Sequence, residues 1–362
     1  MIQEQIITTI DEIQKLLAEI VVMDVIFEGG ASSGNWGHRG RPGKRGGSGA
    51  GGGTAHDYKK KTGEPTTGLS ASAKAILKQY EDSAKAASIE GKSEDQLKVD
   101  ISKRLGKRTK DISDDMLAKG KMSEYFELND FIKYAAGDVA PGSADLKVHE
   151  EAARQLIRQW EGTSGDSNPR SIMMQLAAKK EFGLKSTSIW WKPGKVEEAT
   201  KLLETHEKPA RMFLREMYND TQEHLAKQGL KTVRLSRGYR GDIGISPSNN
   251  TNPIGKANIK LQPMTSFSAS VDVAMSFSRM AGNDNRAILF SEFPASRILS
   301  CPVTGYGCKK EFEYVVLGAK SETMLGSFIP DLKRAGNVRS WSKIFTKDVE
   351  SGIMNAISKV TK

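Results

Sequence analysis

The sequence predicts an α+β protein in which helices precede a strand-rich C-terminal module. Between residues 70 and about 230, apolar side chains recur at the three- and four-residue spacing of amphipathic helices. From about residue 231 the apolar runs become short and rich in β-branched or aromatic residues, and clusters of glycine, proline and asparagine separate them. Helices that lead into a separate run of strands favour an α+β fold over alternating βαβ units.

The spacing of apolar residues over positions 1–27 predicts an amphipathic helix. Its apolar stripe consists of Ile6, Ile10, Ile13, Leu17 and Ile20. A single helix cannot bury such a stripe, so we expect it to dock on the later domain, on a second copy of the chain or on a capsid partner. Its acidic character disfavours a membrane-surface helix. No apolar run approaches the roughly 20 residues that span a bilayer, and no secretory signal pattern is present, so no membrane association is expected.

Residues 28–68 are predicted to be a flexible linker, because glycine dominates and almost nothing apolar is available for burial. Its basic residues are Arg39, Arg41, Lys44 and Arg45, and the whole chain has a net charge of +10. Two interpretations stay open: a simple tether, or weak nucleic-acid binding by residues 39–45 through phosphate contacts. The run Asn35-Trp-Gly-His-Arg-Gly-Arg-Pro-Gly43 resembles linkers of tailed-phage head proteins and prophage polyproteins.

The rest of the chain divides into a helical region of unknown role (69–140), a domain (141–330) and a tail or helix (331–362). The Pro141-Gly142 pair marks the boundary. Helices are predicted over Ala71–Ile89, Ser93–Arg104 (opening with a capping box), Asp114–Ala136, Ala144–Trp160, Pro169–Phe182, Lys195–Thr205 and Lys208–Gln228. Strands are predicted over Thr232–Gly238, Ala287–Phe290, Arg297–Leu299 and Glu313–Gly318.

Three short segments contain candidate catalytic residues. The first places Arg237 at the end of a strand, before a turn glycine. The second is Ser266-Phe-Ser268, which is followed at helical spacing by Ala274 and Phe277. The third is Glu311-Phe-Glu313, which enters an apolar strand. Taken singly, they are also typical of a surface ion pair, a helix cap and a solvated strand face.

In this order the three segments resemble the arginine, serine-x-serine, glutamate-x-glutamate signature of the mono-ADP-ribosyltransferase family, which includes cholera-type and clostridial exoenzyme toxins. The resemblance covers about residues 205–328, with helices from about 145 as lead-in. It implies a C-terminal fold of two packed, antiparallel-rich β-sheets with flanking helices, and NAD as the substrate. Together with the phage-like linker, it implies a phage- or prophage-encoded member. Phe267 departs from the pattern, because the family usually has threonine there.

The chemistry of NAD explains why these residue types are needed. Breaking the nicotinamide–ribose bond generates an oxocarbenium-like transition state, which glycosidases stabilise with carboxylates. The resemblance makes Glu313 the residue that binds the ribose 2′-hydroxyl and stabilises the developing charge. Glu311 then orients and helps deprotonate an accepting arginine. A strand places residues two apart on one face, so we expect both carboxylates to face the same way.

The resemblance implies supporting roles for further residues. Arg237 would hold an NAD phosphate through its planar guanidinium, and Ser266 would hydrogen-bond and orient Glu313. Tyr306, in the turn before the glutamates, is expected to face a protein substrate. The additional NAD-binding candidates are Ser268, Phe277 and Arg279, the last in a phosphate–nicotinamide loop.

The sequence therefore predicts an enzyme that transfers ADP-ribose from NAD to a protein arginine. Two alternatives are an NAD glycohydrolase that uses the same pocket, and a virion structural or DNA-associated protein with a vestigial enzyme domain. No metal is expected, because Cys301, Cys308 and the scattered histidines lack the spacing of a zinc site. We expect the protein in the cytoplasm of a bacterial host, with virion association before delivery.

Overall fold

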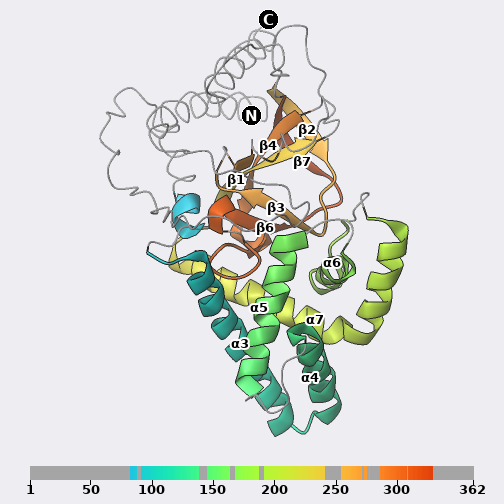
Figure 1. Cartoon of the computed structure of the whole chain (residues 1–362). Coiled ribbons are helices and arrows are strands. Elements are labelled where there is room, and N and C mark those ends of the chain that lie inside the picture. The colour runs from blue at the N-terminus through green and yellow to red at the C-terminus, as the bar shows by residue number, and fades with distance from the viewer. Residues whose placement is uncertain are drawn as a thin grey trace, which may run out of the picture.

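A computed structural model describes residues 82–87, 91–137, 145–163, 168–186, 191–240, 254–270, 273–274, 277, 286–307 and 309–328. The N-terminal helix, the linker and the C-terminal tail that we expected lie outside these residues. Within them, helices come first along the chain and strands follow (Figure 1). The prediction of an α+β protein, with helices and an antiparallel sheet, is therefore confirmed.

The helices are α3 (Glu94–Ala118), α4 (Met122–Ala136), α5 (Asp145–Thr163), α6 (Pro169–Glu181) and α7 (Pro193–Lys227). The predicted capping box opens α3. The Ser93 hydroxyl accepts a hydrogen bond from the Gln96 backbone N–H at 3.2 Å, and the Gln96 side chain accepts one from the Ser93 N–H at 3.0 Å. The box satisfies N–H groups that a helix otherwise leaves unpaired at its start.

A break separates α3 from α4, where the sequence predicted a continuous helix over Asp114–Ala136. Gly120 takes a positive φ of 68°, a conformation that glycine adopts without steric cost. The Lys121 N–H then donates to the Met116 carbonyl at 2.8 Å, which closes the end of α3.

The reverse error occurs at α7, where two helices were predicted and the structure has a single helix of 35 residues. Pro209 lies inside it. A proline removes one backbone hydrogen bond and bends a helix, but burial of the apolar side of α7 compensates for that loss. Figure 1 shows α7 turning along its length.

The strands are β1 (Thr232–Arg240), β2 (Ile254–Ile259), β3 (Met264–Ser268), β4 (Arg286–Pro294), β5 (Ile298–Ser300), β6 (Glu313–Leu317) and β7 (Glu322–Phe328). They form one seven-stranded sheet in the order β2-β7-β4-β1-β3-β6-β5, and its neighbouring strands run antiparallel. The expectation of two packed β-sheets is therefore not confirmed, because the described strands all join in one sheet. The sheet has two parts, β2-β7-β4-β1 and β3-β6-β5. A single register pair, Ser236 with Ser268, joins β1 to β3 and so connects these two parts.

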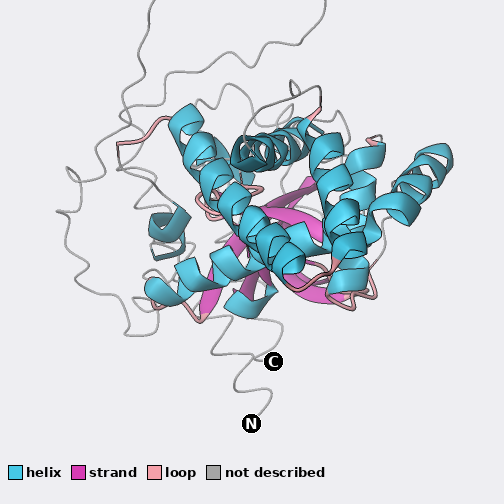
Figure 2. Ribbon diagram, turned by 90° about the horizontal axis from the view of Figure 1, so that it is seen from below, coloured by secondary structure: helices cyan, strands magenta, loops and turns pink. Residues whose placement is uncertain are grey.

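Two hydrophobic cores lie on opposite faces of the β5–β6 end of the sheet. The helical core combines side chains of α3 to α7 with Leu299, Val315 and Leu317. The sheet core takes the alternate residues, including Val316, and side chains from both parts of the sheet. Figure 2 shows the helices gathered over one side of the strands.

The helical core contains residues from both sides of the predicted boundary near Pro141. Leu105 of α3 and Phe131 of α4 belong to it, as do Ile157 of α5 and Phe213 of α7. The boundary itself falls between α4 and α5, in residues outside the description. Helices on the two sides of it therefore pack around one core.

The crossing of α3 and α5 depends on Gly106. A Cβ atom at this position would lie 2.7 Å from the Cα and the backbone N of Glu150 in α5. We therefore expect Gly106→Ala to lower the free energy of unfolding by about 1–3 kcal/mol, because overpacking outweighs the better helix propensity of alanine. Urea unfolding of the purified chain measures this difference.

The matched control is Gly194→Ala near the start of α7, where an added Cβ would meet nothing within 4 Å. This variant should be neutral or slightly stabilising. If both variants change the free energy of unfolding by the same amount, α3 and α5 do not pack tightly at Gly106, and the explanation by overpacking is wrong.

Candidate active site

Neighbouring strands bring the three sequence segments together. β3 carries the serine segment and lies between β1, which contains Arg237, and β6, which begins at Glu313. Ser268 is the register partner of Ser236 on one side and of Glu313 on the other. The segments therefore meet at the junction between the two parts of the sheet.

Glu313 is a buried carboxylate on the helical face of the sheet. Its residue is 6% exposed, and Val315 and Leu317, which alternate with it along β6, lie in the helical core. Trp160 of α5 is 3% exposed, and its indole Nε1–H donates to Glu313 Oε1 at 3.4 Å. A buried carboxylate needs such donors, because the loss of water is costly for a charge.

Glu311 does not lie on the strand. It ends a short 3₁₀ helix, Lys309–Glu311, and β6 starts only at Glu313. The prediction that strand alternation places both carboxylates on one face is therefore wrong. Phe312, between them, has a positive φ of 46°. This conformation is uncommon for a bulky residue and costs about 1 kcal/mol or more, so packing around Phe312 must enforce it.

The carboxyl of Glu311 nevertheless lies in a strongly acidic neighbourhood. Burial, followed by the charges of Glu313, Glu94 and Glu161, raises the pKa of Glu311 to about 7. Burial also raises the pKa of Glu161, against the opposing effect of Lys98. The Lys98 ammonium lies 2.6 Å from Glu161 and 3.4 Å from Glu94, so it joins α3 to α5 beside the site.

Arg237 is half-buried on β1 and donates to the backbone carbonyl of Ser266. Val233 and Leu235, which alternate with it along β1, lie in the sheet core, so its side chain leaves the strand on that face. Glu313 leaves β6 on the other face. The structure thus places the two residues on neighbouring parts of the same junction, but does not direct both side chains to one face.

Phe267, the departure from the family pattern, points into the sheet core. It is 2% exposed, and its ring meets Phe293 edge to face with centroids 4.9 Å apart. The Arg237 guanidinium lies 5.8 Å from the same ring centroid. The middle position of the serine segment is therefore an apolar core position here, which explains why a phenylalanine fits.

The serine that pairs with Glu313 is Ser268, whereas Ser266 pairs with Val315. The Ser268 hydroxyl donates to the Glu311 carbonyl at 2.6 Å and accepts from the Ser270 N–H at 2.9 Å. Ser268 therefore holds the chain where it turns from Glu311 into β6. The role expected of Ser266, orientation of Glu313, stays a prediction.

Tyr306 is a core residue, and not the exposed aromatic that the resemblance implies. Its residue is 1% exposed and its ring stacks on Trp160, with centroids 5.3 Å apart and planes at 14°. The ring of Phe213 in α7 also packs on the Tyr306 ring, with centroids 6.4 Å apart. In this structure the ring cannot contact a protein substrate.

The turn that contains Tyr306 is fixed by several helices. Thr221 of α7 donates to the Thr304 hydroxyl at 2.8 Å, and Arg104 of α3 donates to the Val303 carbonyl. The Arg104 side chain is held by Asp220, because Arg104 Nε donates to Asp220 Oδ2 at 3.3 Å. Residues 301–307, just before the glutamates, are therefore covered by α3, α5 and α7.

The remaining candidates are less informative. Phe277 is half-buried, and Arg279 and Cys308 lie outside the described residues. Cys301 is a free, fully buried thiol, and burial raises its pKa to about 11, which makes it unreactive.

Two further features, a metal centre and a membrane-spanning helix, are absent from the described ranges. No group of three or more histidine, cysteine or acidic side chains is arranged there to hold a metal ion. None of the helices there combines the length and the apolar character needed to cross a bilayer.

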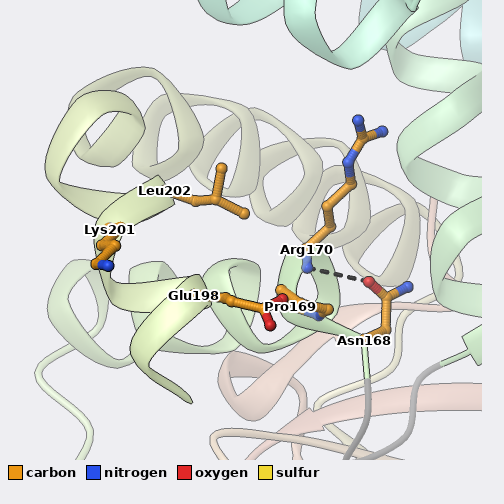
Figure 3. Close-up of a pocket in the computed structure, with 6 residues that line it drawn as sticks. All are labelled: Asn168, Pro169, Arg170, Glu198, Lys201 and Leu202. Carbon is orange, nitrogen blue, oxygen red and sulfur yellow. Dashed lines mark hydrogen bonds between the residues drawn. The ribbon is translucent and has the colours of Figure 1, made fainter. Parts of the chain in front are cut away.

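A surface depression of about 500 Å³ lies at the start of α6, against the first part of α7 (Figure 3). The Asn168 side chain caps α6 there by accepting from the Arg170 N–H at 3.0 Å. The lining residues are Asn168, Pro169, Arg170, Glu198, Lys201 and Leu202. None of them belongs to the three motif segments, so this depression is separate from the candidate site around Glu313.

Comparison with protein-family models, with curated proteins and with solved structures finds no match to this chain.

Sequence reasoning missed the contributions of Trp160, Glu161 and Lys98. In the sequence, Trp160 is one of the apolar positions of an amphipathic helix, and the two charges resemble ordinary solvated residues. No local pattern marks them, because their proximity to Glu313 and Glu311 comes from the packing of α3 and α5 against β6.

Because the pKa of Glu311 is raised, the free energy of unfolding should depend on pH. Its pKa of about 7 in the folded state exceeds the usual 4.5, so between these pH values the folded chain holds more protons than the unfolded chain. This group therefore lowers stability as the pH rises from about 4.5 to 7. Glu311→Gln should raise the unfolding temperature at pH 8 and should not raise it at pH 5.

Thermal unfolding at both pH values provides the measurement. Glu204→Gln, on an exposed position of α7, is the control and should change neither temperature by much. The same shift at pH 5 and pH 8 for Glu311→Gln would contradict the electrostatic explanation.

Proposed function

We propose that the chain cleaves the nicotinamide–ribose bond of NAD and transfers ADP-ribose to an arginine of a protein. The observation that carries this proposal is the buried Glu313 at the start of β6, next to Ser268 and one residue beyond the left-handed Phe312. A buried carboxylate and a strained backbone are costly, and such features are retained where function needs them.

In the proposed reaction, the bond between ribose C1′ and the nicotinamide nitrogen breaks, and the bonding electrons leave with nicotinamide. Positive charge develops on the ribose, and the Glu313 carboxylate stabilises it while accepting a hydrogen bond from the 2′-hydroxyl. Burial strengthens this interaction, because the effective dielectric constant around a 6%-exposed residue is lower than in water.

The acceptor step gives Glu311 its proposed role. A guanidinium nitrogen of the acceptor arginine bonds to C1′ and loses a proton. A base with a pKa near the working pH serves this purpose best, and the pKa of Glu311 is about 7 because of burial and the nearby Glu313. Its carboxylate also attracts the cationic acceptor.

Arg237 is proposed to bind an NAD phosphate. Its guanidinium donates to the Ser266 carbonyl, which fixes the side chain beside β3. A guanidinium has five N–H donors in a planar fork, so this bond is compatible with a phosphate contact. The role requires the phosphates to lie on the sheet-core side of the junction, away from Trp160.

A second candidate function is NAD hydrolysis, in which water accepts the ADP-ribose. The buried Tyr306 favours it, because the turn before the glutamates is covered by helices and does not face a protein acceptor. The same Glu313 chemistry serves both reactions, and only the acceptor differs.

The test uses NAD labelled on the adenylate and an arginine-containing peptide. We expect Glu313→Gln to slow release of nicotinamide by roughly 100-fold or more, the usual cost of removing a group that stabilises transition-state charge. Glu311→Gln should abolish peptide labelling but keep part of the nicotinamide release.

Glu204→Gln, the exposed control, should match the unchanged chain in both activities. Free ADP-ribose without labelled peptide would replace the transferase proposal with the hydrolase. Nicotinamide release that does not depend on Glu313 would overturn the assignment of the site.

A further inference from the structure

The contact between α5 and Glu313 points to a role that no sequence motif contains. Trp160 lies near the end of α5, 153 positions before Glu313 in the chain, and its Nε1–H donates to Glu313 Oε1 at 3.4 Å. Both residues are buried, at 3% and 6% exposure. In this low-dielectric setting a hydrogen bond to a carboxylate is stronger than the same bond in water.

Two contacts fix the indole in its place. Its ring stacks on Tyr306, which belongs to the turn that α3, α5 and α7 cover. The next residue, Glu161, pairs with Lys98 of α3 at 2.6 Å, which anchors the same turn of α5. The Trp160 side chain therefore has little freedom, and the donor stays directed at the carboxylate.

We propose that Trp160 is a positioning residue for the NAD-cleaving carboxylate, which it orients and keeps ionised by donating its indole N–H to Glu313. The inference rests on the proposed function of Glu313. It extends the candidate site from β1, β3 and β6 to the helical layer, so that α5 forms part of the site as well as part of the core.

The acidic groups near Glu313 favour its protonation, and the indole N–H opposes this effect. The charges of Glu311 and of Glu161 in α5 interact with that of Glu313, and Glu94 of α3 acts in turn on Glu311 and Glu161. Lys98 lies against Glu94 and Glu161, and Arg237 bonds the Ser266 carbonyl. Acidic groups favour protonation of a neighbouring carboxyl, so a donor held on Glu313 opposes that tendency.

The decisive variant is Trp160→Phe, which removes the N–H donor but keeps an aromatic ring to stack on Tyr306. Trp191→Phe is its matched control. Trp191 also packs against the helical core, and its Nε1 has no hydrogen-bond partner among the residues that the structure describes. Both variants lose the same atoms, and only one loses a contact with Glu313.

The first measurement is nicotinamide release from NAD as a function of pH, which does not require an acceptor arginine. For Trp160→Phe we expect kcat to fall about three- to tenfold, with little change in KM. The acidic limb of the profile should move to higher pH by about 0.5, because a carboxylate without its donor protonates more easily. Trp191→Phe should leave the profile where it is.

The second measurement is independent of activity. The chain has five tryptophans, and ¹⁵N-labelled indole groups give separate N–H signals in NMR. Trp160→Phe identifies the signal of Trp160. Glu313→Gln should then shift this signal and leave that of Trp191 unchanged.

The outcomes are distinguishable. A Trp160→Phe profile identical to that of Trp191→Phe, or a Trp160 signal insensitive to Glu313→Gln, overturns the positioning role. If the unchanged chain releases no nicotinamide, the proposed function fails and the catalytic role of Trp160 fails with it, while the NMR result still decides whether the indole bonds the carboxylate.

Discussion

The burial of one carboxylate, Glu313, is the constraint around which the rest of the structure is organised. A charge removed from water is tolerated only where hydrogen-bond donors and rigid packing replace the lost solvation. Trp160 supplies a donor from the helical layer, and Ser268 of β3 is the register partner of Glu313 on β6. The strained Phe312 lies directly before it. The buried carboxylate and the strained backbone would each cost stability in isolation, and they lie next to each other at the start of β6.

The helical layer determines the environment of the site. α3, α5 and α7 all contact the turn over residues 301–307, through Arg104, Trp160 and Thr221. Their packing leaves Trp160 only 3% and Glu313 only 6% exposed between the helices and β6. Burial of this kind raises the pKa of Glu161 in α5 and also that of Glu311, which lies outside the helical layer. The layer thus forms one wall of the candidate site.

The two faces of β6 contribute to different cores. One face of β6 contributes to the helical core and presents Glu313, whereas the other contributes to the sheet core and includes Tyr314 and Val316. The link between β1 and β3 is a single partner pair, so the sheet is weakest in hydrogen bonds where the motifs meet. Arg237 and Glu313 lie on either side of this link. A ligand that contacts both would have to bridge the junction between the two parts of the sheet.

The sequence by itself determined the order of helices and strands, the capping box at Ser93 and the residues of the three motifs. Local patterns suffice for these features, because periodicity, caps and turn residues act over a few positions. It did not predict β2 and β7, which contain glycine and form by pairing with each other. It also misplaced Glu311 on a strand and Tyr306 on the surface. Only the tertiary structure decided those positions, the register that pairs Ser268 with Glu313, and the contact of Trp160, since each depends on residues far apart in the chain that packing brings together.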